Sequence, residues 1–325
     1  MSVSVVIPAL NAADFIFRAI DSALSQGRVL HEVIVVDDGS TDDTGTVVSD
    51  TSRRDARVRL VTLPMNQGPG PARNAGFAAA TGDWIAILDA DDVYLPGRLD
   101  YLVENAEQFN LDFAADNILL FDHTARRVSR IGIRPEMIGA VLHVNRYEFV
   151  RNCCGTSDAK VDFGLLQPIV RTSFLRRQNL SYPPIRHGED FAFCLEGLLA
   201  GGRFGVFPEA YYMVTERTGG ISGKSSPLTR TTVNFGGMER HAREMAEVAQ
   251  ANGDRELAEL LLKRANHMLR TSLLRQVKNH WKSRQLHSCA RIVCTDRRAL
   301  TACFDAGFRK MLRVAQKEVR EPATL

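Results

Sequence analysis

The feature that most restricts the fold is a series of strand-like runs separated by helical patterns. The runs in the first third of the chain are Val3–Ile7, Val33–Val36, Val58–Leu63 and Trp84–Leu88. Between the first two runs, Ile16, Ile20 and Leu24 recur at helical spacing. Near-continuous apolar strands that alternate with helices are typical of a parallel sheet covered on both faces. We therefore predict an α/β fold with a mostly parallel sheet and helices on both of its faces.

The composition is that of a folded, soluble protein. Of the 325 residues, 45% are hydrophobic and 24% are charged, which excludes a disordered chain. No apolar stretch approaches the roughly 20 residues that cross a bilayer. None of the six cysteines belongs to a C-x-x-C pair, and the first strand starts without a basic leader segment. We expect a cytoplasmic protein with unpaired thiols.

Polar residues follow each predicted strand. These segments are Pro8-Ala9-Leu10-Asn11, Asp37-Asp38, Asn66 to Arg73 and Asp89 to Asp92. Because the carboxyl ends of parallel strands meet at one edge of a sheet, where open α/β sheets bind ligands, we expect one shared crevice. No G-x-G-x-x-G follows the first strand and no Walker lysine is present, so a nucleotide would be held differently from NAD or ATP.

The segment Asp89-Ala90-Asp91-Asp92 is the strongest candidate for chemistry. Alternation along a strand would point Asp89 and Asp91 the same way, so that they could share one Mg²⁺ or Mn²⁺ ion. The alternative is a polar turn that caps the helix starting near Pro96, since aspartate is a common N-cap residue. In the same way, Ser40 or Thr41 is expected to cap the helix that follows the second strand.

Together these motifs resemble glycosyltransferase family 2. The matching motifs are Val5 to Asn11, Val35 to Asp42, the loop from Asn66 to Gly76, and Leu88 to Asp92, in that order. The likeness covers residues 1–100 closely and extends loosely to about 225. It implies a GT-A fold and the transfer of a sugar, with inversion, from a nucleotide donor that is usually UDP-linked. It says little about which sugar is moved.

The resemblance also implies a donor site. Pro8, Ala9 and Asn11 would line the base and ribose pocket, one of Asp37 and Asp38 would accept a hydrogen bond from uracil, Gly68 and Gly70 would let the backbone approach the ligand, and Arg73 would meet the base or a phosphate. Asp89 would contact the ribose or the metal, and Asp91 would bind the Mn²⁺ or Mg²⁺ ion that bridges the diphosphate. Asp92 would support that site.

The acceptor side is predicted around Glu189-Asp190, which open an amphipathic helix. By resemblance to the family's acidic pair, Asp190 would be the catalytic base, and Glu189 would support the site or hold an acceptor hydroxyl. His187 is a second candidate for the base. The alternative is structural, because acids in the first turn of a helix are favoured by its dipole.

A Gly-rich loop follows the strand around Tyr211–Glu216. Its Arg217 and Ser222 match positions in many family members and would fold over the donor diphosphate as a lid. A solvent loop without a function is the alternative.

The C-terminal part is basic and helical. Apolar residues keep helical spacing from Leu257 to Val277 and from Leu300 to Leu312, and Lys263 to Arg320 holds fifteen Lys and Arg against three acids. This face could be merely solvated, could contact an anionic membrane at its inner side or a lipid-linked acceptor, or could pair with another copy of the chain. Sparse aromatic residues argue against nucleic acid.

The preferred domain division is 1–226 as the transferase domain, with a donor half (1–100) and an acceptor half (101–226), followed by 227–325. The predicted function is an inverting, metal-dependent transfer of one sugar from a UDP-sugar to a glycan acceptor in bacterial polysaccharide synthesis. A nucleotidyltransferase is disfavoured because no Gly-rich, basic loop follows the first strand. A non-catalytic protein that binds a nucleotide sugar or a polysaccharide on the same fold is the main alternative.

Overall fold

A computed structural model of the chain describes residues 1–123, 125–154, 163–216 and 234–282. The chain divides into two units, Met1–Val233 and Asn234–Leu325. The predicted boundary between residues 226 and 227 falls outside the described residues.

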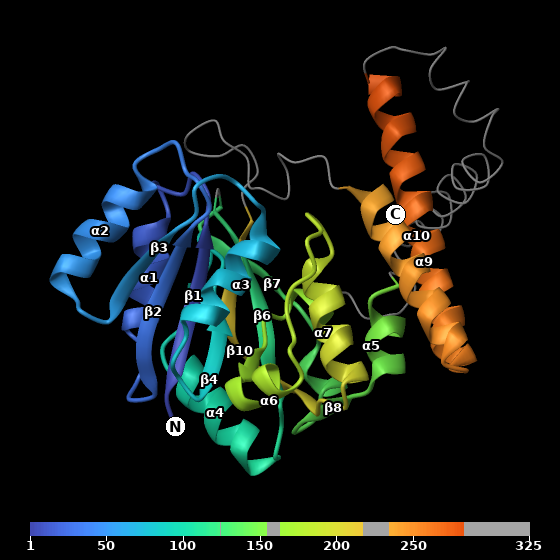
Figure 1. Ribbon diagram of the computed structural model, residues 1–325, viewed down its shortest axis with the longest axis horizontal. Helices are drawn as coiled ribbons and strands as arrows, with labels where there is room; N and C mark the ends of the chain where they lie inside the picture. Colours follow the sequence, from blue (N-terminus) through green and yellow to red (C-terminus); the bar gives the residue numbers. More distant parts are fainter. Residues whose placement is uncertain (124, 155–162, 217–233, 283–325) are drawn as a thin grey trace, which may run out of the picture. The chain divides into compact units, whose positions relative to one another are not determined.

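The first half of the larger unit is the predicted parallel sheet (Figure 1). Its strands are β1 (Val3–Ala9), β2 (Leu30–Asp37), β3 (Val58–Thr62) and β4 (Trp84–Ile87), and its helices are α1 (Ile16–Leu24), α2 (Thr44–Arg54) and α3 (Pro69–Ala79). Adjacent strands in the order β3-β2-β1-β4 are all parallel. Apolar residues of β1, β2 and β4 are almost completely buried, as their continuous apolar pattern requires.

The second half continues the same sheet with mixed pairing. Its elements are β5 (Val93–Tyr94), α4 (Arg98–Gln108), β6 (Phe113–Asp122), β7 (Arg127–Ile131), the short helix η1 (Pro135–Met137), β8 (Leu142–Val144), α5 (Arg146–Asn152), the short helix η2 (Phe163–Leu165), β9 (Ile169–Arg171), α6 (Thr172–Arg177), α7 (Glu189–Leu199) and β10 (Phe204–Glu216). β9 joins the halves because it is antiparallel to both β4 and β6, whereas β6 and β10 are parallel. The predicted α/β fold is confirmed.

The predicted cap of α2 is wrong. α2 begins at Thr44, and its N-cap residue Asp43 makes no side-chain cap hydrogen bond. Ser40 and Thr41 instead bond to Asn11 at the end of β1, with N···O distances of 2.9 Å in both contacts. The sequence pattern predicts that Ser40 or Thr41 caps α2, but both residues bond to Asn11 instead.

Helix α3 lies very close to β1. A Cβ atom on Gly76 would be 2.2 Å from a methyl carbon of Val6, so only glycine permits this approach. The close packing fixes the position of α3, which carries Arg73, against the sheet.

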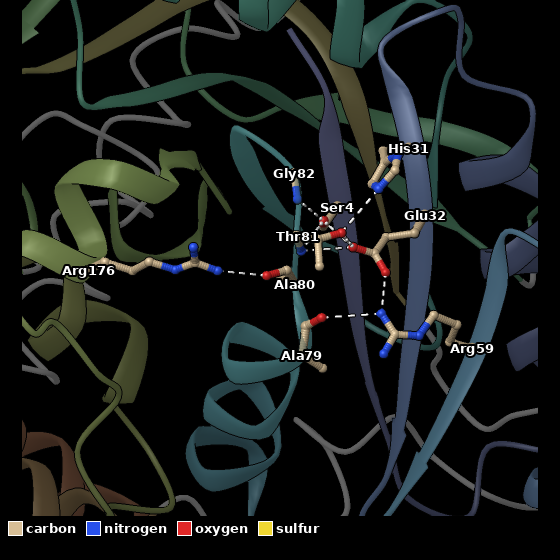
Figure 2. A network of polar contacts seen from close by, with 9 residues as sticks. All are labelled: Ser4, His31, Glu32, Arg59, Ala79, Ala80, Thr81, Gly82 and Arg176. Carbon is tan, nitrogen blue, oxygen red and sulfur yellow. Dashed lines mark hydrogen bonds and ion pairs between the residues drawn. The ribbon is translucent and has the colours of Figure 1, made fainter.

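The opposite edge of the sheet is held by the buried carboxylate of Glu32 (Figure 2). Its Oε1 accepts hydrogen bonds from Ser4 Oγ at 2.8 Å and from Thr81 N at 2.8 Å, and its Oε2 is 2.5 Å from Arg59 Nη1. These contacts join β1, β2, β3 and the segment between α3 and β4. The hydrogen bonds outweigh burial and lower the pKa of Glu32 from 4.5 to about 2.

Because the pKa of Glu32 is lower in the folded protein, its contribution to stability is complete above pH 4.5 and is lost as the pH falls toward about 2. We expect Glu32→Gln to lower the free energy of unfolding at pH 7 by about 3 kcal/mol, and by much less at pH 3. Urea titrations at both pH values would measure this. Glu104→Gln, at an exposed position of α4, is the control. Equal losses at the two pH values would contradict the assignment.

In the described part of the smaller unit, helices α9 (Phe235–Ala251) and α10 (Arg255–Lys282) pack against each other (Figure 1). Their buried residues include Ala242, Ala246, Leu257, Leu261 and Ala265, so the helix predicted over Leu257–Val277 is confirmed. The helix predicted over Leu300–Leu312 lies outside the described residues. Over the described ranges, no helix combines the length and apolar character needed to span a membrane. Cys153, Cys154 and Cys194 are buried.

Candidate active site

Asn11 joins the ends of β1 and β2. It has a left-handed backbone with φ 50°, which asparagine adopts more readily than most residues. Its Oδ1 accepts from Thr41 N and its own N–H donates to Ser40 Oγ. Pro8 and Ala9 are the last two residues of β1. The residues predicted to line a base pocket therefore lie together at neighbouring strand ends.

Asp37 and Asp38, at the end of β2, are both buried and both accept backbone hydrogen bonds. Asp37 Oδ1 accepts from Ser40 N at 2.9 Å. The two oxygens of Asp38 accept from Gln67 N at 2.8 Å and from Gly68 N at 2.9 Å. Gly68 has φ 101°, a conformation that side chains disfavour. Asp38 thus fixes the loop that leads into α3.

Arg73, on α3, lies among three carboxylates from two distant segments of the chain. Its side chain is 3% exposed, and its Nη2 is 3.0 Å from Asp89 Oδ1. Its Nη1 is 3.0 Å from Glu189 Oε1 and 3.0 Å from Asp190 Oδ1. One positive charge therefore faces three acids. The structure brings the predicted acidic segment and the predicted catalytic pair to one place.

Asp190 lies in the first turn of α7, as the sequence predicts. Burial raises the pKa of Asp190 well above 3.8, Arg73 opposes the rise, and the charges of Glu189 and Asp89 add to it. Tyr182 also hydrogen-bonds to Asp190. The Tyr182 ring stacks on Phe193, with centroids 4.3 Å apart, so its position is fixed by packing. A carboxyl with a raised pKa is suited to accept a proton near neutral pH.

The acidic segment forms a turn and does not end a strand. β4 ends at Ile87, and Asp92 N donates to the Asp89 carbonyl at 3.0 Å. The predicted alternation of Asp89 and Asp91 along a strand is therefore wrong. Asp89 and Asp91 are nevertheless partly exposed, whereas Asp92 is buried. Two of the three carboxylates remain accessible to a ligand.

β10 holds this acidic turn through Tyr212 and Thr215. Asp89 N donates to the Tyr212 hydroxyl at 3.2 Å, and that hydroxyl donates to Asp92 Oδ2 at 3.0 Å. Thr215 N donates to Asp92 Oδ1 at 2.8 Å. Burial, followed by the charges of Asp91 and Asp89, raises the pKa of Asp92 well above 3.8. Negative charge is therefore concentrated at the turn.

A buried ion pair supports the turn. Arg98 and Asp116 are both 0% exposed, and Arg98 Nη2 is 2.8 Å from Asp116 Oδ1. The Arg98 guanidinium also lies over the rings of Tyr94 at 4.4 Å and Tyr212 at 5.0 Å. Asp116 accepts from Tyr211 N at 2.8 Å. Arg98 therefore fixes the Tyr212 ring whose hydroxyl binds the acidic turn.

Other site predictions have different outcomes. Arg217 and Ser222 lie outside the described residues. Gly70 packs closely against protein backbone, since a Cβ there would be 2.9 Å from the Pro183 carbonyl oxygen, and its role beside a ligand stays a prediction. Sequence reasoning gave no role to Tyr182, Tyr212 or Arg98. Of these three residues, only Tyr212 had a signal in the sequence, as part of the run Tyr211-Tyr212 within a predicted strand.

Comparison with known proteins identifies the family. Residues 4–159 match the profile described as Glycosyl transferase family 2. An uncharacterized glycosyltransferase of Haemophilus influenzae (strain ATCC 51907 / DSM 11121 / KW20 / Rd) is 31% identical over 203 residues, which are 60% of this chain and 71% of that protein. The chain belongs to glycosyltransferase family 2.

Two further proteins extend the comparison of this family 2 glycosyltransferase. "Succinoglycan biosynthesis protein ExoO" of Rhizobium meliloti (strain 1021) is 40% identical over 222 residues, or 68% of this chain, and the chain spans 62% of ExoO. The structure of S. aureus TarS 1-349 in complex with UDP-GlcNAc is similar, with a TM-score of 0.64, 19% identity and 90% coverage of both chains. This likeness establishes the GT-A fold of the glycosyltransferase.

Proposed function

We propose that this glycosyltransferase moves one sugar, with inversion, from a UDP-sugar to a hydroxyl of a lipid-linked glycan acceptor in the synthesis of a bacterial surface polysaccharide. The observation that carries the proposal is the position of Arg73 between Asp89 and Asp190, 3.0 Å from each. The acidic turn and the candidate base therefore border one site. The name of ExoO supports a polysaccharide product, and the UDP-GlcNAc complex of TarS supports the donor class.

The acidic turn fits a divalent cation. Asp89 and Asp91 are partly exposed, and their charges raise the pKa of buried Asp92, so a cation would relieve a repulsion that is present in the protein. Nowhere in the described part of the chain do three or more His, Cys, Asp or Glu side chains form a group that could hold a metal. This suits Mg²⁺ or Mn²⁺, which are commonly held by one or two carboxylates, with substrate phosphates and water as the other ligands. Asp91 and Asp89 would hold the ion, which would supply charge neutralisation to the departing diphosphate.

The remaining steps belong to side chains of the protein. Pro8, Ala9 and Asn11, with Asp37 or Asp38, would hold the nucleoside at the ends of β1 and β2. Asp190 would remove the proton of the acceptor hydroxyl as that oxygen attacks the sugar carbon from the side opposite the diphosphate. Tyr182 and Arg73 position the Asp190 carboxylate, and Glu189 shares the same guanidinium. Arg217 and Ser222 remain predicted contacts of the diphosphate.

The test is donor turnover by the purified protein. A panel of UDP- and GDP-sugars would be incubated with Mn²⁺, with Mg²⁺ or with a chelator, and release of the nucleoside diphosphate measured with and without glycan acceptors. We expect cation-dependent release from a UDP-sugar that an acceptor accelerates. Tight UDP binding with no release under any condition would instead favour a non-catalytic binding protein.

Tyr212→Phe is expected to weaken cation binding at the acidic turn. The variant removes the hydroxyl that contacts both Asp89 N and Asp92 Oδ2, which leaves buried groups without a partner. We expect a loss of about 1–3 kcal/mol of stability and a several-fold rise in the Mn²⁺ concentration that gives half-maximal turnover.

Tyr94→Phe is the matched control for Tyr212→Phe. The Tyr94 hydroxyl is also buried, but it donates to the Ile87 carbonyl at 2.6 Å and not to the acidic turn. We expect a similar loss of stability without a change in the Mn²⁺ requirement. A shift in that requirement for both variants, or for neither, would contradict a specific role of Tyr212.

The cytoplasmic location and pairing through the C-terminal helices stay predictions.

A further inference from the structure

Four arginines form an exposed cluster around β7, which we call the arginine ribbon. They are Arg126, Arg127, Arg130 and Arg134, and all four side chains are exposed. Across the described ranges, none of the four forms an ion pair; the one polar contact is from Arg134 Nη2 to Met137 Sδ at 3.6 Å. Two acids, Asp122 and Glu136, lie within the same stretch of chain, so the ribbon has an excess of positive charge.

The ribbon lies beside the candidate active site. Thr215, which binds Asp92, pairs with Phe121 of β6, and Phe121 pairs with Val128 of β7. Neighbouring strands are about 4.8 Å apart, so β7 is about 10 Å from the part of β10 that holds the acidic turn. Arg127 pairs with Asp122, the last residue of β6, and thus lies at the same edge of the sheet as the site.

The arrangement suits an extended anionic surface and not a single small anion. Arg127 and Arg130 lie on the same face of β7, because they pair with Asp122 and Leu120, which are two residues apart on β6, and a register shift in β7 lies between them. Exposed apolar side chains accompany the charges: Val128 is 49% exposed and Met137 is 44% exposed. Charges on one face of an exposed strand, mixed with apolar groups, match the phosphate and upper acyl regions of a bilayer.

The backbone at Arg126 supports a role for its charge. Arg126 has φ 50°, in the left-handed region that glycine and asparagine adopt most easily. Local conformation therefore does not account for an arginine at this position. The side chain is exposed and makes no ion pair with the described residues, so its charge is available to an outside anion.

We propose that the arginine ribbon docks the protein on an anionic lipid bilayer. The ribbon would hold the active-site edge of the sheet against the membrane, where a lipid-linked acceptor would be presented. This goes beyond the proposed transfer reaction, because membrane binding requires neither donor nor acceptor. If the membrane-binding proposal failed, the sugar-transfer proposal would be unaffected, and the reverse also holds.

The experiment is co-sedimentation of the full chain with phosphatidylcholine vesicles that contain or lack phosphatidylglycerol. The test variant combines Arg126→Gly, Arg127→Gln, Arg130→Gln and Arg134→Gln; glycine is chosen because it suits the backbone at position 126. The control removes the same charge elsewhere in the same unit through Arg28→Gln, Arg53→Gln, Arg54→Gln and Arg57→Gln, all at exposed positions. Donor turnover reports that each variant is folded.

We expect the wild type and the control to bind the anionic vesicles and the ribbon variant to bind them about tenfold or more weakly, with weak binding of all three to neutral vesicles. Added salt should weaken binding of the wild type to anionic vesicles until it approaches the binding of the ribbon variant. Equal binding by the ribbon variant and the control would overturn the proposal and assign any membrane contact to the C-terminal part. Equal binding of the wild type to neutral and anionic vesicles would also overturn it.

Discussion

Sugar transfer by Asp190→Asn is expected to be about a thousandfold slower than by the wild type, at the scale of losing a general base. Asparagine keeps the size of the side chain and its place at the start of α7. It cannot take up the proton of the acceptor hydroxyl. Donor binding should change little, because Asp190 is assigned to the acceptor. Single-turnover rates and UDP affinity, measured on both proteins, would separate the two effects.

The pH dependence gives a second readout for Asp190. Only the ionised carboxylate acts as a base, so the transfer rate should rise with pH through its pKa. Burial raises that pKa above 3.8, and the acid limb of kcat/KM should therefore lie well above pH 3.8. Glu189→Gln removes a neighbouring charge that raises this pKa, so it should slow transfer less and move the limb to lower pH. Near-normal transfer by Asp190→Asn would remove Asp190 from the mechanism.

Arg73→Met is expected to produce the largest loss of stability among the site variants. The substitution leaves Asp89, Glu189 and Asp190 facing one another without their shared cation. Removing one member of a buried ion pair costs about 3–5 kcal/mol. The loss should be larger at pH 8 than at pH 5, because protonation at the lower pH relieves the repulsion between the acids. Chemical denaturation at the two pH values would measure it.

Mn²⁺ should restore part of the stability of Arg73→Met, because a cation at Asp89 and Asp91 would reduce the same repulsion. The control is Arg57→Met, which removes a cation from a more exposed pair with Asp55, 2.7 Å apart. That variant should lose no more than about 1 kcal/mol, with no response to Mn²⁺. Equal losses for the two variants would contradict the central position assigned to Arg73.

Local patterns predicted the first half of the fold well. β1, β2 and β4 are buried apolar runs, and Glu189-Asp190 open a helix as expected, since each of these features depends on neighbouring residues. The geometry of the acidic segment differs from the prediction: the strand ends at Ile87, and a turn replaces the expected alternation. Strand length is decided by contacts across the sheet.

Contacts between distant segments could not be predicted from the sequence. Tyr212 and Asp92 are 120 residues apart, and Arg73 and Glu189 are 116 apart, so no spacing rule connects them. Arg73 was predicted to meet a base or a phosphate, whereas the structure places it against three carboxylates. Asp116 has no local signal either, because its partner Arg98 precedes it on α4 and meets it only in the packed core.

The most direct test of the account is the effect of Mn²⁺ on UDP binding, measured by calorimetry on the wild type and on Asp91→Ala. If the acidic turn holds a divalent cation that neutralises the diphosphate, Mn²⁺ should strengthen UDP binding to the wild type by about tenfold or more. In Asp91→Ala this gain should disappear, with folding intact. UDP binding that is equally strong with and without Mn²⁺ in the wild type would contradict the account.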